Sequence, residues 1–317
     1  MMKKLDLIFD TDAGSDCDDM MALGYLIYAE EHLGVNIRAV THSHVSPHGA
    51  AAIRGTFRYF GKQPPPIGVM VGGNAFEDHY VGEVDRRFAV DEDRWQAESA
   101  VRVLRRALAE CEDKAVICAV GPLTNIAALL ESQPDDISPL DGESLIREKC
   151  LRAVLMAGKF SPDTMGRLTE EWNICCDIPS ALIVARLFPS PLFWLPSETG
   201  TGIMTGKRLM DEYGMESPIS TAFILFPWLD KEGRHSWDPA AAMFAVEGEK
   251  GLLRVARGRV CMAENGITTL VEDDQAEGGI ILMREGGEAE AQYKRLTAEY
   301  LDSVVMSIHK ELSNNRA

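Results

Sequence analysis

The sequence has little positive charge and no long apolar run, and these two deficits exclude several classes of protein. Its 317 residues include 32 lysines and arginines against 49 aspartates and glutamates, giving a formal charge of −17. So acidic a chain lacks the clustered cations that binding to nucleic acid or to an anionic membrane surface requires. No stretch approaches the roughly 18 consecutive apolar residues of a membrane-spanning helix. We therefore expect neither a nucleic acid nor a membrane as a partner.

Cysteine patterns typical of disulfide frameworks or zinc sites are also missing. The seven cysteines are scattered and odd in number, and no two have Cys-x-x-Cys spacing. The apolar run after Lys3 and Lys4 is interrupted by Asp6 and is too short for a signal peptide. These features indicate a cytoplasmic protein with reduced thiols.

Short apolar runs alternate with stretches of helical periodicity. We expect strands over 5–9, 35–40, 67–71, 115–120, 151–156 and 191–195. We expect helices over 18–32, 49–60, 95–110, 179–187 and from the segment after residue 120 to 130. Strand followed by helix, six times, predicts an open, mostly parallel α/β sheet with helices on both faces.

The pattern changes after Thr205, where helices dominate to about Glu247. Residues 252–271 and 279–283 are expected to form antiparallel strands, and a final helix is expected over 288–312. With no linker, repeat or low-complexity tract, we predict one domain over 1–317. Its site is expected where the parallel strands end.

Five carboxylates stand within ten residues, between the first strand and the first helix, in Asp10-Thr-Asp-Ala-Gly-Ser-Asp-Cys-Asp-Asp19. Each pair at ~4 Å costs on the order of 1 kcal/mol even in water, and more when partly buried. The helix N-terminus near Asp18 offsets only about 1 kcal/mol. A bound divalent cation would offset the rest, and all-oxygen ligands favour Ca²⁺ or Mg²⁺ over zinc.

Three other interpretations of this cluster compete, and one of them fails. It could be a helix cap with a solvated acidic turn. An EF-hand loop fails, because Ser15 stands at the required glycine and Met21 at the closing glutamate. A Mg²⁺-dependent phosphatase of the haloacid dehalogenase type would use Asp10 as nucleophile and Asp12 as general acid, but its loop normally continues Gly-Thr.

Four segments resemble, in order, the motifs of the inosine/uridine-preferring nucleoside hydrolase family. The first is Asp10-Thr-Asp-Ala-Gly with Asp18-Asp19-Met-Met-Ala-Leu, and the second is Gly121-Pro-Leu-Thr-Asn. The third is Leu155-Met-Ala-Gly with Glu171-Trp-Asn-Ile and Asp177, and the fourth is Trp237-Asp-Pro. The resemblance implies a nucleoside hydrolase-like fold and calcium-dependent hydrolysis of an N-ribosyl bond. It also implies a nucleoside-like substrate and a homodimer or homotetramer.

The resemblance implies a calcium site with four protein ligands. These would be Asp12, Asp19, the backbone carbonyl of Thr124 and the carboxylate of Asp238. Asp12 would also orient the attacking water and take its proton. Carboxylates around a calcium ion would favour an oxocarbenium-like sugar, so one acidic pocket would serve both metal and transition state.

The resemblance also implies the residues that hold the sugar. Asp18 would bind a ribose hydroxyl, Glu171 and Asn173 would hold the 5′ side of the ribose, and Trp237 would line the pocket. Asp10 would then support the site from behind or cap a helix. Gly-Pro-Leu-Thr-Asn alone would be an ordinary strand-to-helix turn, and Glu171 and Asn173 could be surface residues of a polar loop.

This chain departs from the family pattern at three places. Three residues, Ser-Asp-Cys, separate Gly14 from Asp18 where well-known members have one, which leaves Asp16 as another possible ligand or ribose contact. Ala13 replaces a usual proline. Trp237 replaces the histidine that protonates the departing base, and an indole N–H can only hydrogen-bond.

Leaving-group activation must therefore come from elsewhere, or be absent. His235 is one substitute, and one of His42, His44 and His48 could face the pocket. Trp172 and Trp237 could stack on a nucleobase, and Trp228 could lie near the opening. A ribosyl-binding protein that has lost catalysis is the alternative function.

Overall fold

The computed structural model describes residues 4–72, 77–94 and 97–316. Its main sheet has ten strands in the order β11-β10-β12-β7-β6-β5-β1-β2-β3-β4. The strands are β1 (Leu5–Thr11), β2 (Val35–His42), β3 (Ile67–Val69), β4 (Glu98–Ser99), β5 (Ala115–Ala119), β6 (Cys150–Met156), β7 (Leu192–Leu195), β10 (Leu253–Met262), β11 (Thr268–Glu272) and β12 (Gly279–Met283). Pairing from β4 through β12 is parallel, and β10 pairs antiparallel with both β12 and β11.

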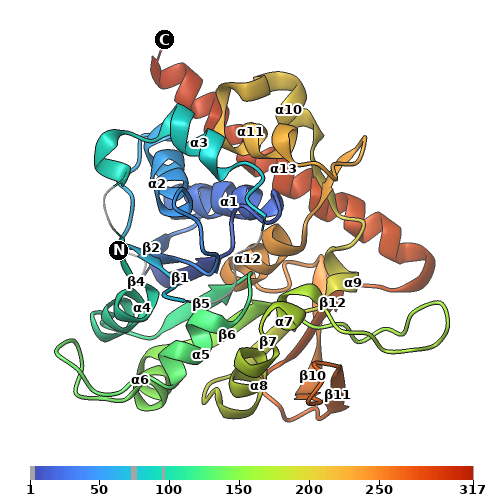
Figure 1. The fold of residues 1–317 in the computed structure, drawn as a ribbon. Helices are drawn as coiled ribbons and strands as arrows, with labels where there is room; N and C mark the ends of the chain where they lie inside the picture. Colours follow the sequence, from blue (N-terminus) through green and yellow to red (C-terminus); the bar gives the residue numbers. More distant parts are fainter. Residues whose placement is uncertain (1–3, 73–76, 95–96, 317) are drawn as a thin grey trace.

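Helices cover both faces of this sheet (Figure 1). They are α1 (Asp18–His32), α2 (Gly49–Tyr59), α3 (Val81–Phe88), α4 (Ala100–Ala109), α5 (Thr124–Leu130), α6 (Gly142–Lys149), α7 (Trp172–Cys176), α8 (Ile178–Leu187), α9 (Ser197–Gly200), α10 (Lys207–Tyr213), α11 (Pro218–Leu225), α12 (Trp237–Glu247) and α13 (Glu290–Arg316).

The alternation of side chains along β1 divides the core into two layers. Leu7 and Phe9 pack on one side with α1, α2, α11, α12 and α13, whereas Ile8 packs on the other with α4, α5, α6 and α8. Because both faces of β1 are covered, its three central residues, 7–9, are all apolar and buried. The predicted fold class is confirmed.

The structure corrects several boundaries. Where a helix was expected over 95–110, the described residues form the short strand β4 and then α4. Trp95 lies outside the described residues. The antiparallel strands join the main sheet, because β12 pairs with β7. The segment 204–206 (β8) pairs with 233–235 (β9) in a two-stranded ribbon that the sequence pattern did not indicate. Within the described residues, no helix is long and apolar enough to cross a bilayer.

Candidate active site

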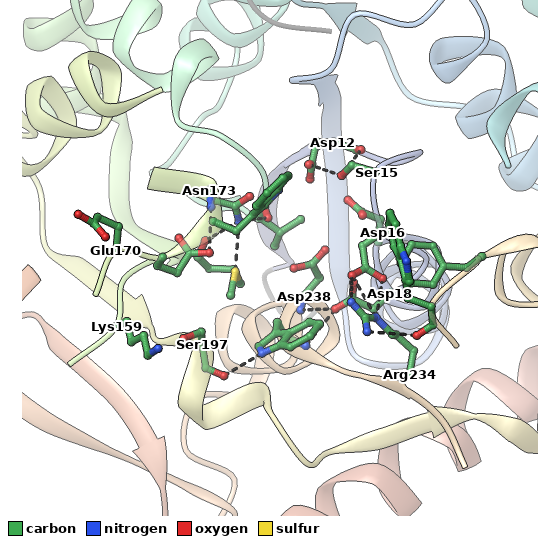
Figure 2. Close-up of a pocket in the computed structure, with 18 residues that line it drawn as sticks. Asp12, Ser15, Asp16, Asp18, Lys159, Glu170, Asn173, Ser197, Arg234 and Asp238 are labelled. Carbon is green, nitrogen blue, oxygen red and sulfur yellow. Dashed lines mark hydrogen bonds and ion pairs between the residues drawn. The ribbon is translucent and has the colours of Figure 1, made fainter. Parts of the chain in front are cut away.

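A cavity of about 430 Å³ opens where β1, β5 and β6 end (Figure 2). These strands are parallel neighbours, so the residues that follow them meet at one edge of the sheet. The cavity is lined by Asp12, Ser15, Asp16, Asp18, Asp19, Val120, Met156, Lys159, Glu170, Glu171, Trp172, Asn173, Ser197, Phe226, Trp228, Arg234, Trp237 and Asp238.

Asp12 follows β1 directly, is buried and lines the cavity. The Ser15 hydroxyl donates a hydrogen bond to its Oδ2. A Cβ at Gly121 would lie only 2.7 Å from Asp12 Oδ1, so the glycine leaves the space that this carboxylate occupies. Burial raises the pKa of Asp12 to about 6, although the Ser15 hydrogen bond opposes the shift.

Asp18, Asp19 and Asp238 form a buried carboxylate trio at the first turns of α1 and α12. One carboxylate oxygen of each lies within 4.8 Å of the other two. Asp18 Oδ2 accepts the N–H groups of Trp237 at 3.0 Å and Asp238 at 3.1 Å. The Thr11 hydroxyl donates to Asp19 Oδ1. Burial raises the pKa of all three, and repulsion by neighbouring carboxylates, Asp12 and Asp16 among them, adds to the shift.

The trio fits a hard divalent cation. Asp19 Oδ2 is buried and has no hydrogen-bond partner among the described residues. An unpaired buried carboxylate oxygen is costly, and a cation bound by carboxylates satisfies it. Two predicted ligands, Asp19 and Asp238, are thus brought together, with Asp18 as the third member. Asp12 lines the same cavity but stands outside the trio.

Thr124 is the first residue of α5, just beyond the end of β5. Its hydroxyl donates to Asp177 Oδ2 at 2.6 Å. Thr124 is not among the residues that line the cavity in the described part of the chain. Its role as a carbonyl ligand stays a prediction.

Glu171 and Asn173 belong to a short helix rather than a surface loop. Glu171 caps α7, because its carboxylate accepts the N–H groups of Asn173 at 2.9 Å and Ile174 at 3.2 Å. Asn173 Nδ2 donates to the carbonyls of Val120 at 2.8 Å and Met156 at 3.0 Å. Both side chains are buried and line the cavity, and burial raises the pKa of Glu171 to about 7.

Trp237 also lines the cavity, but its polar atom is used elsewhere. The indole Nε1–H donates to the Ser197 carbonyl at 2.8 Å (Figure 2) and contacts the Thr201 hydroxyl at 3.2 Å. Two further tryptophans, Trp172 and Trp228, line the cavity with 65% and 61% of their surfaces exposed, which places them at its mouth.

The four histidines proposed as substitute acids do not line the cavity. His235 Nδ1 accepts the Gly202 N–H at 3.0 Å, and His42 Nε2 lies 2.8 Å from the Ala13 carbonyl. His48 Nδ1 lies 2.8 Å from Asp85, and His44 is buried. No histidine is among the cavity-lining residues that the structure describes.

Asp10 lies behind the cavity. It is fully buried, and its Oδ1 accepts the Asn125 amide at 2.7 Å and the Thr41 hydroxyl. Burial raises its pKa to about 7 against the opposing effect of these hydrogen bonds. Because Asp10 does not line the cavity, it supports the strand ends rather than contacting a ligand.

The sequence analysis missed Arg234, which lines the cavity from β9 and forms an ion pair with Asp16. The sequence marks the insertion that contains Asp16, but Arg234, the ion-pair partner of Asp16, lies 218 positions away. Nothing in the local pattern around Arg234 signals this contact.

Comparison with known proteins agrees with the fold and with the family resemblance. A family model described as inosine-uridine preferring nucleoside hydrolase matches residues 7–297. The chain matches no curated protein sequence.

Several solved structures share the fold. The inosine-uridine preferring nucleoside hydrolase from Bacillus anthracis is 20% identical, with a TM-score of 0.66 over 93% of this chain and 99% of that one. A purine-preferring ribonucleoside hydrolase from Gardnerella vaginalis is 17% identical, with a TM-score of 0.67 over 95% and 99%. The type III effector protein XopQ, solved with adenosine diphosphate ribose, is 14% identical, with a TM-score of 0.67 over 96% and 95%.

The family model spans most of the chain, and the motif residues from both halves of the sequence meet at one cavity. The chain therefore belongs to the inosine-uridine preferring nucleoside hydrolase family.

Proposed function

We propose that this protein is a calcium-dependent hydrolase that cleaves the N-glycosidic bond of a ribonucleoside or a related ribosyl compound, giving ribose and the free base. One observation carries the proposal. Carboxylates from the turn after β1, from α1 and from α12 converge in a cavity that also holds Glu171 and Asn173. This set combines oxygen ligands for a cation with polar groups for a sugar.

Asp12, Asp19 and Asp238, with the carbonyl of Thr124, would hold the calcium ion. The unpaired Asp19 Oδ2 and the closeness of Asp19 to Asp238 support these two ligands, and Asp12 and Thr124 are assigned from the family resemblance. When bound, calcium supplies Lewis-acid polarisation of the ribose hydroxyl and water oxygens near the scissile bond. The ion would also lower the pKa of the surrounding carboxyls, which would keep them ionised.

Asp12 acts as the general base. Its carboxylate takes the proton of the attacking water as the water oxygen bonds to C1′ of the ribose. Burial raises the pKa of Asp12 above that of an ordinary aspartate, which strengthens it as a base, while the bound ion would keep the carboxylate ionised. Ser15 orients the carboxylate by donating to Oδ2.

The remaining polar groups hold the sugar. Asp18 binds a ribose hydroxyl, and Glu171 and Asn173 hold the 5′ side from the other end of the cavity. The side chains at both ends of the cavity are held in place, because Asp18 is hydrogen-bonded to the first turn of α12 and Glu171 caps α7. The negative charge of the cavity stabilises the oxocarbenium-like sugar as the glycosidic bond lengthens. Trp237 and Trp172 provide aromatic faces for a base.

Sugar release tests this proposal. Purified protein is incubated with calcium and a panel of ribonucleosides, and reducing sugar is measured. We expect ribose from at least one substrate and a loss on the order of 10²-fold or more in Asp12→Asn, the usual scale for removing a general base. Asp274→Asn, at an exposed position outside the cavity, is the matched control and should keep full activity. No release from any ribosyl compound, with calcium demonstrably bound, would refute the proposal.

A second function, ribosyl binding without turnover, is favoured by one observation. The indole N–H of Trp237 is engaged by Ser197, and no described histidine lines the cavity to protonate a base. Ligand binding by calorimetry without sugar release would support this alternative, whereas release that depends on Asp12 would exclude it. The phosphatase interpretation requires Asp10 as nucleophile, and the buried position of Asp10 behind the cavity argues against it.

A further inference from the structure

An ion pair between Asp16 and Arg234 forms one wall of the cavity, beside Asp18 and on the far side from Lys159 and Glu170 (Figure 2). Arg234 Nε lies 3.0 Å from Asp16 Oδ1, and Nη2 lies 2.5 Å from Oδ2. The two side chains are 19% and 24% exposed, so the pair is partly desolvated. A two-point contact of this kind fixes the plane of the guanidinium.

Aromatic rings hold the same guanidinium from its faces. Its central carbon lies 4.8 Å from the ring centre of Phe226 and 5.0 Å from that of Trp237. Arg234 is thus held directly against the residue that replaces the family's proton-donating histidine. Arginine stacks well on aromatic faces because its guanidinium is planar and weakly hydrated.

The fixed guanidinium keeps donors to spare. Arginine carries five N–H groups. One on Nε and one on Nη2 go to Asp16, and Nη1 makes only a 3.5 Å contact with the Trp228 carbonyl. At least two N–H groups are therefore unused by the described residues. Asp16 also neutralises the cation, so the pair supplies donors without opposing a positively charged sugar.

Two departures from the family pattern meet in this contact. Asp16 belongs to the two-residue insertion before α1, and Trp237 replaces the histidine of the late motif. The insertion supplies the carboxylate that holds Arg234, and the tryptophan supplies the face on which it lies. Tyr80 fixes the insertion itself, since its hydroxyl donates to the Asp16 carbonyl at 2.7 Å and accepts the Gly14 N–H at 2.8 Å.

We propose that Arg234, positioned by Asp16, contacts the leaving group and stabilises it as an anion; this inference rests on the proposed function. The C1′–N bond breaks with its electron pair on the base nitrogen, and Arg234 donates hydrogen bonds to the base. The water oxygen bonds to C1′ and its proton goes to Asp12. Because an arginine guanidinium is not deprotonated in proteins, Arg234 keeps its proton, and the base takes one from solvent after release.

This chemistry selects a substrate class. The guanidinium fork favours a base that presents two neighbouring acceptors, as the O6 and N7 edge of a 6-oxopurine does. Adenine places an amino donor at the corresponding position, facing the donors of Arg234. We expect inosine or guanosine to be cleaved faster than adenosine by roughly 10-fold or more, the range of one good bidentate contact.

The test compares leaving groups that need different amounts of help. Arg234→Met and Asp16→Asn are assayed with calcium on inosine and on p-nitrophenyl riboside, whose phenolate departs readily unaided. Arg234→Met should lower kcat/KM about 100-fold on inosine and less than about 5-fold on the nitrophenyl substrate. Asp16→Asn should also lower kcat/KM more on inosine than on the nitrophenyl substrate, by smaller factors. Equal losses on both substrates would overturn the proposal, because a merely structural role affects both alike.

Arg58→Met is the matched control. Arg58 makes a comparable ion pair with the buried Asp93, at 2.7 Å and away from the cavity. Arg58→Met should leave the ratio of kcat/KM on inosine to kcat/KM on p-nitrophenyl riboside unchanged.

Binding of the free base separates this inference from the proposed function. Calorimetry with hypoxanthine should show affinity weakened about 10-fold or more in Arg234→Met and unchanged in Arg58→Met. If the wild-type protein releases no sugar but Arg234→Met weakens base binding, hydrolysis is refuted and the Arg234 contact stands. If Arg234→Met binds hypoxanthine as tightly as the wild-type protein does, or if the wild-type protein does not bind it, the Arg234 contact is overturned. This conclusion holds whether or not the protein releases sugar.

Discussion

Asp18 accepts the backbone N–H of Asp238 at 3.1 Å, across 220 positions of sequence. This hydrogen bond joins the first turn of α1 to the first turn of α12. The two helix N-termini carry partial positive charge toward the same point, which lessens the repulsion among the carboxylates. The two helix ends offset only part of that repulsion, and the calcium ion that we propose would offset the remainder.

Removing one member of the trio should abolish tight calcium binding. Asp238→Ala takes away a carboxylate whose neighbours Asp18 and Asp19 are buried beside it. We expect calcium affinity to fall 100-fold or more and sugar release to fall with it, on the scale of losing a metal ligand. Calorimetric titration with calcium measures this, and affinity within a few-fold of wild type would remove Asp238 from the ligand set.

The hydroxyl of Thr11 should matter through Asp19. Thr11→Val keeps the shape of the side chain but removes the hydrogen bond that orients the Asp19 carboxylate. Loss of such a supporting contact typically weakens metal affinity 10- to 100-fold. The predicted result is a raised calcium requirement with near-normal turnover at saturating calcium. An unchanged calcium titration would show that Thr11 does not position Asp19.

Gly121 should be sensitive to a single methyl group. In Gly121→Ala the new Cβ would lie 2.7 Å from Asp12 Oδ1 and 2.6 Å from Ser43 Oγ, so Asp12 must move. A shift of about 1 Å in a catalytic group can cost 10²-fold in rate. Gly286→Ala, which meets no atom within 4 Å and has an ordinary φ, is the control. Full activity in Gly121→Ala would mean that the position of Asp12 is not critical.

Buried His309 should make stability depend on pH. Its Nδ1 lies 2.8 Å from the Val305 carbonyl and its Nε2 lies 2.7 Å from the Ser217 hydroxyl, a pattern that the neutral ring satisfies. Burial lowers its pKa from 6.5 to about 4, against a small opposing effect of the backbone bond and Glu212. The unfolded chain therefore binds the extra proton between these values, and stability falls as pH drops below 6.5.

Between pH 7 and pH 5 this group should cost about 2 kcal/mol of unfolding free energy. Urea unfolding at the two pH values measures the loss, and His309→Gln should lack this part of it. The same pH dependence in the wild type and the variant would contradict the assignment.

Features encoded locally were predictable from the sequence. The alternation of strands and helices follows from the period of apolar residues, and the Asp10–Asp19 cluster stands in one ten-residue stretch. The placement of Asp238 beside this cluster depended on the resemblance, because only the fold brings α12 to the end of β1.

Contacts between distant segments were not predictable. The Asp16–Arg234 pair joins residues that share no local pattern, and the β8–β9 ribbon that presents Arg234 has only three residues per strand. The α7 helix has five residues, too few for a clear helical period, although Glu171 is its cap. In each case tertiary contacts decide a structure that local propensity leaves open.

The most direct test of the account is sugar release from a ribonucleoside as calcium is returned to chelator-treated protein. We predict no release from the metal-free protein, recovery that saturates at one calcium per chain, and no recovery in Asp238→Ala. Release that persists without any divalent cation, or that is the same in Asp238→Ala, would contradict the claim that carboxylates from both ends of the chain share one catalytic calcium ion.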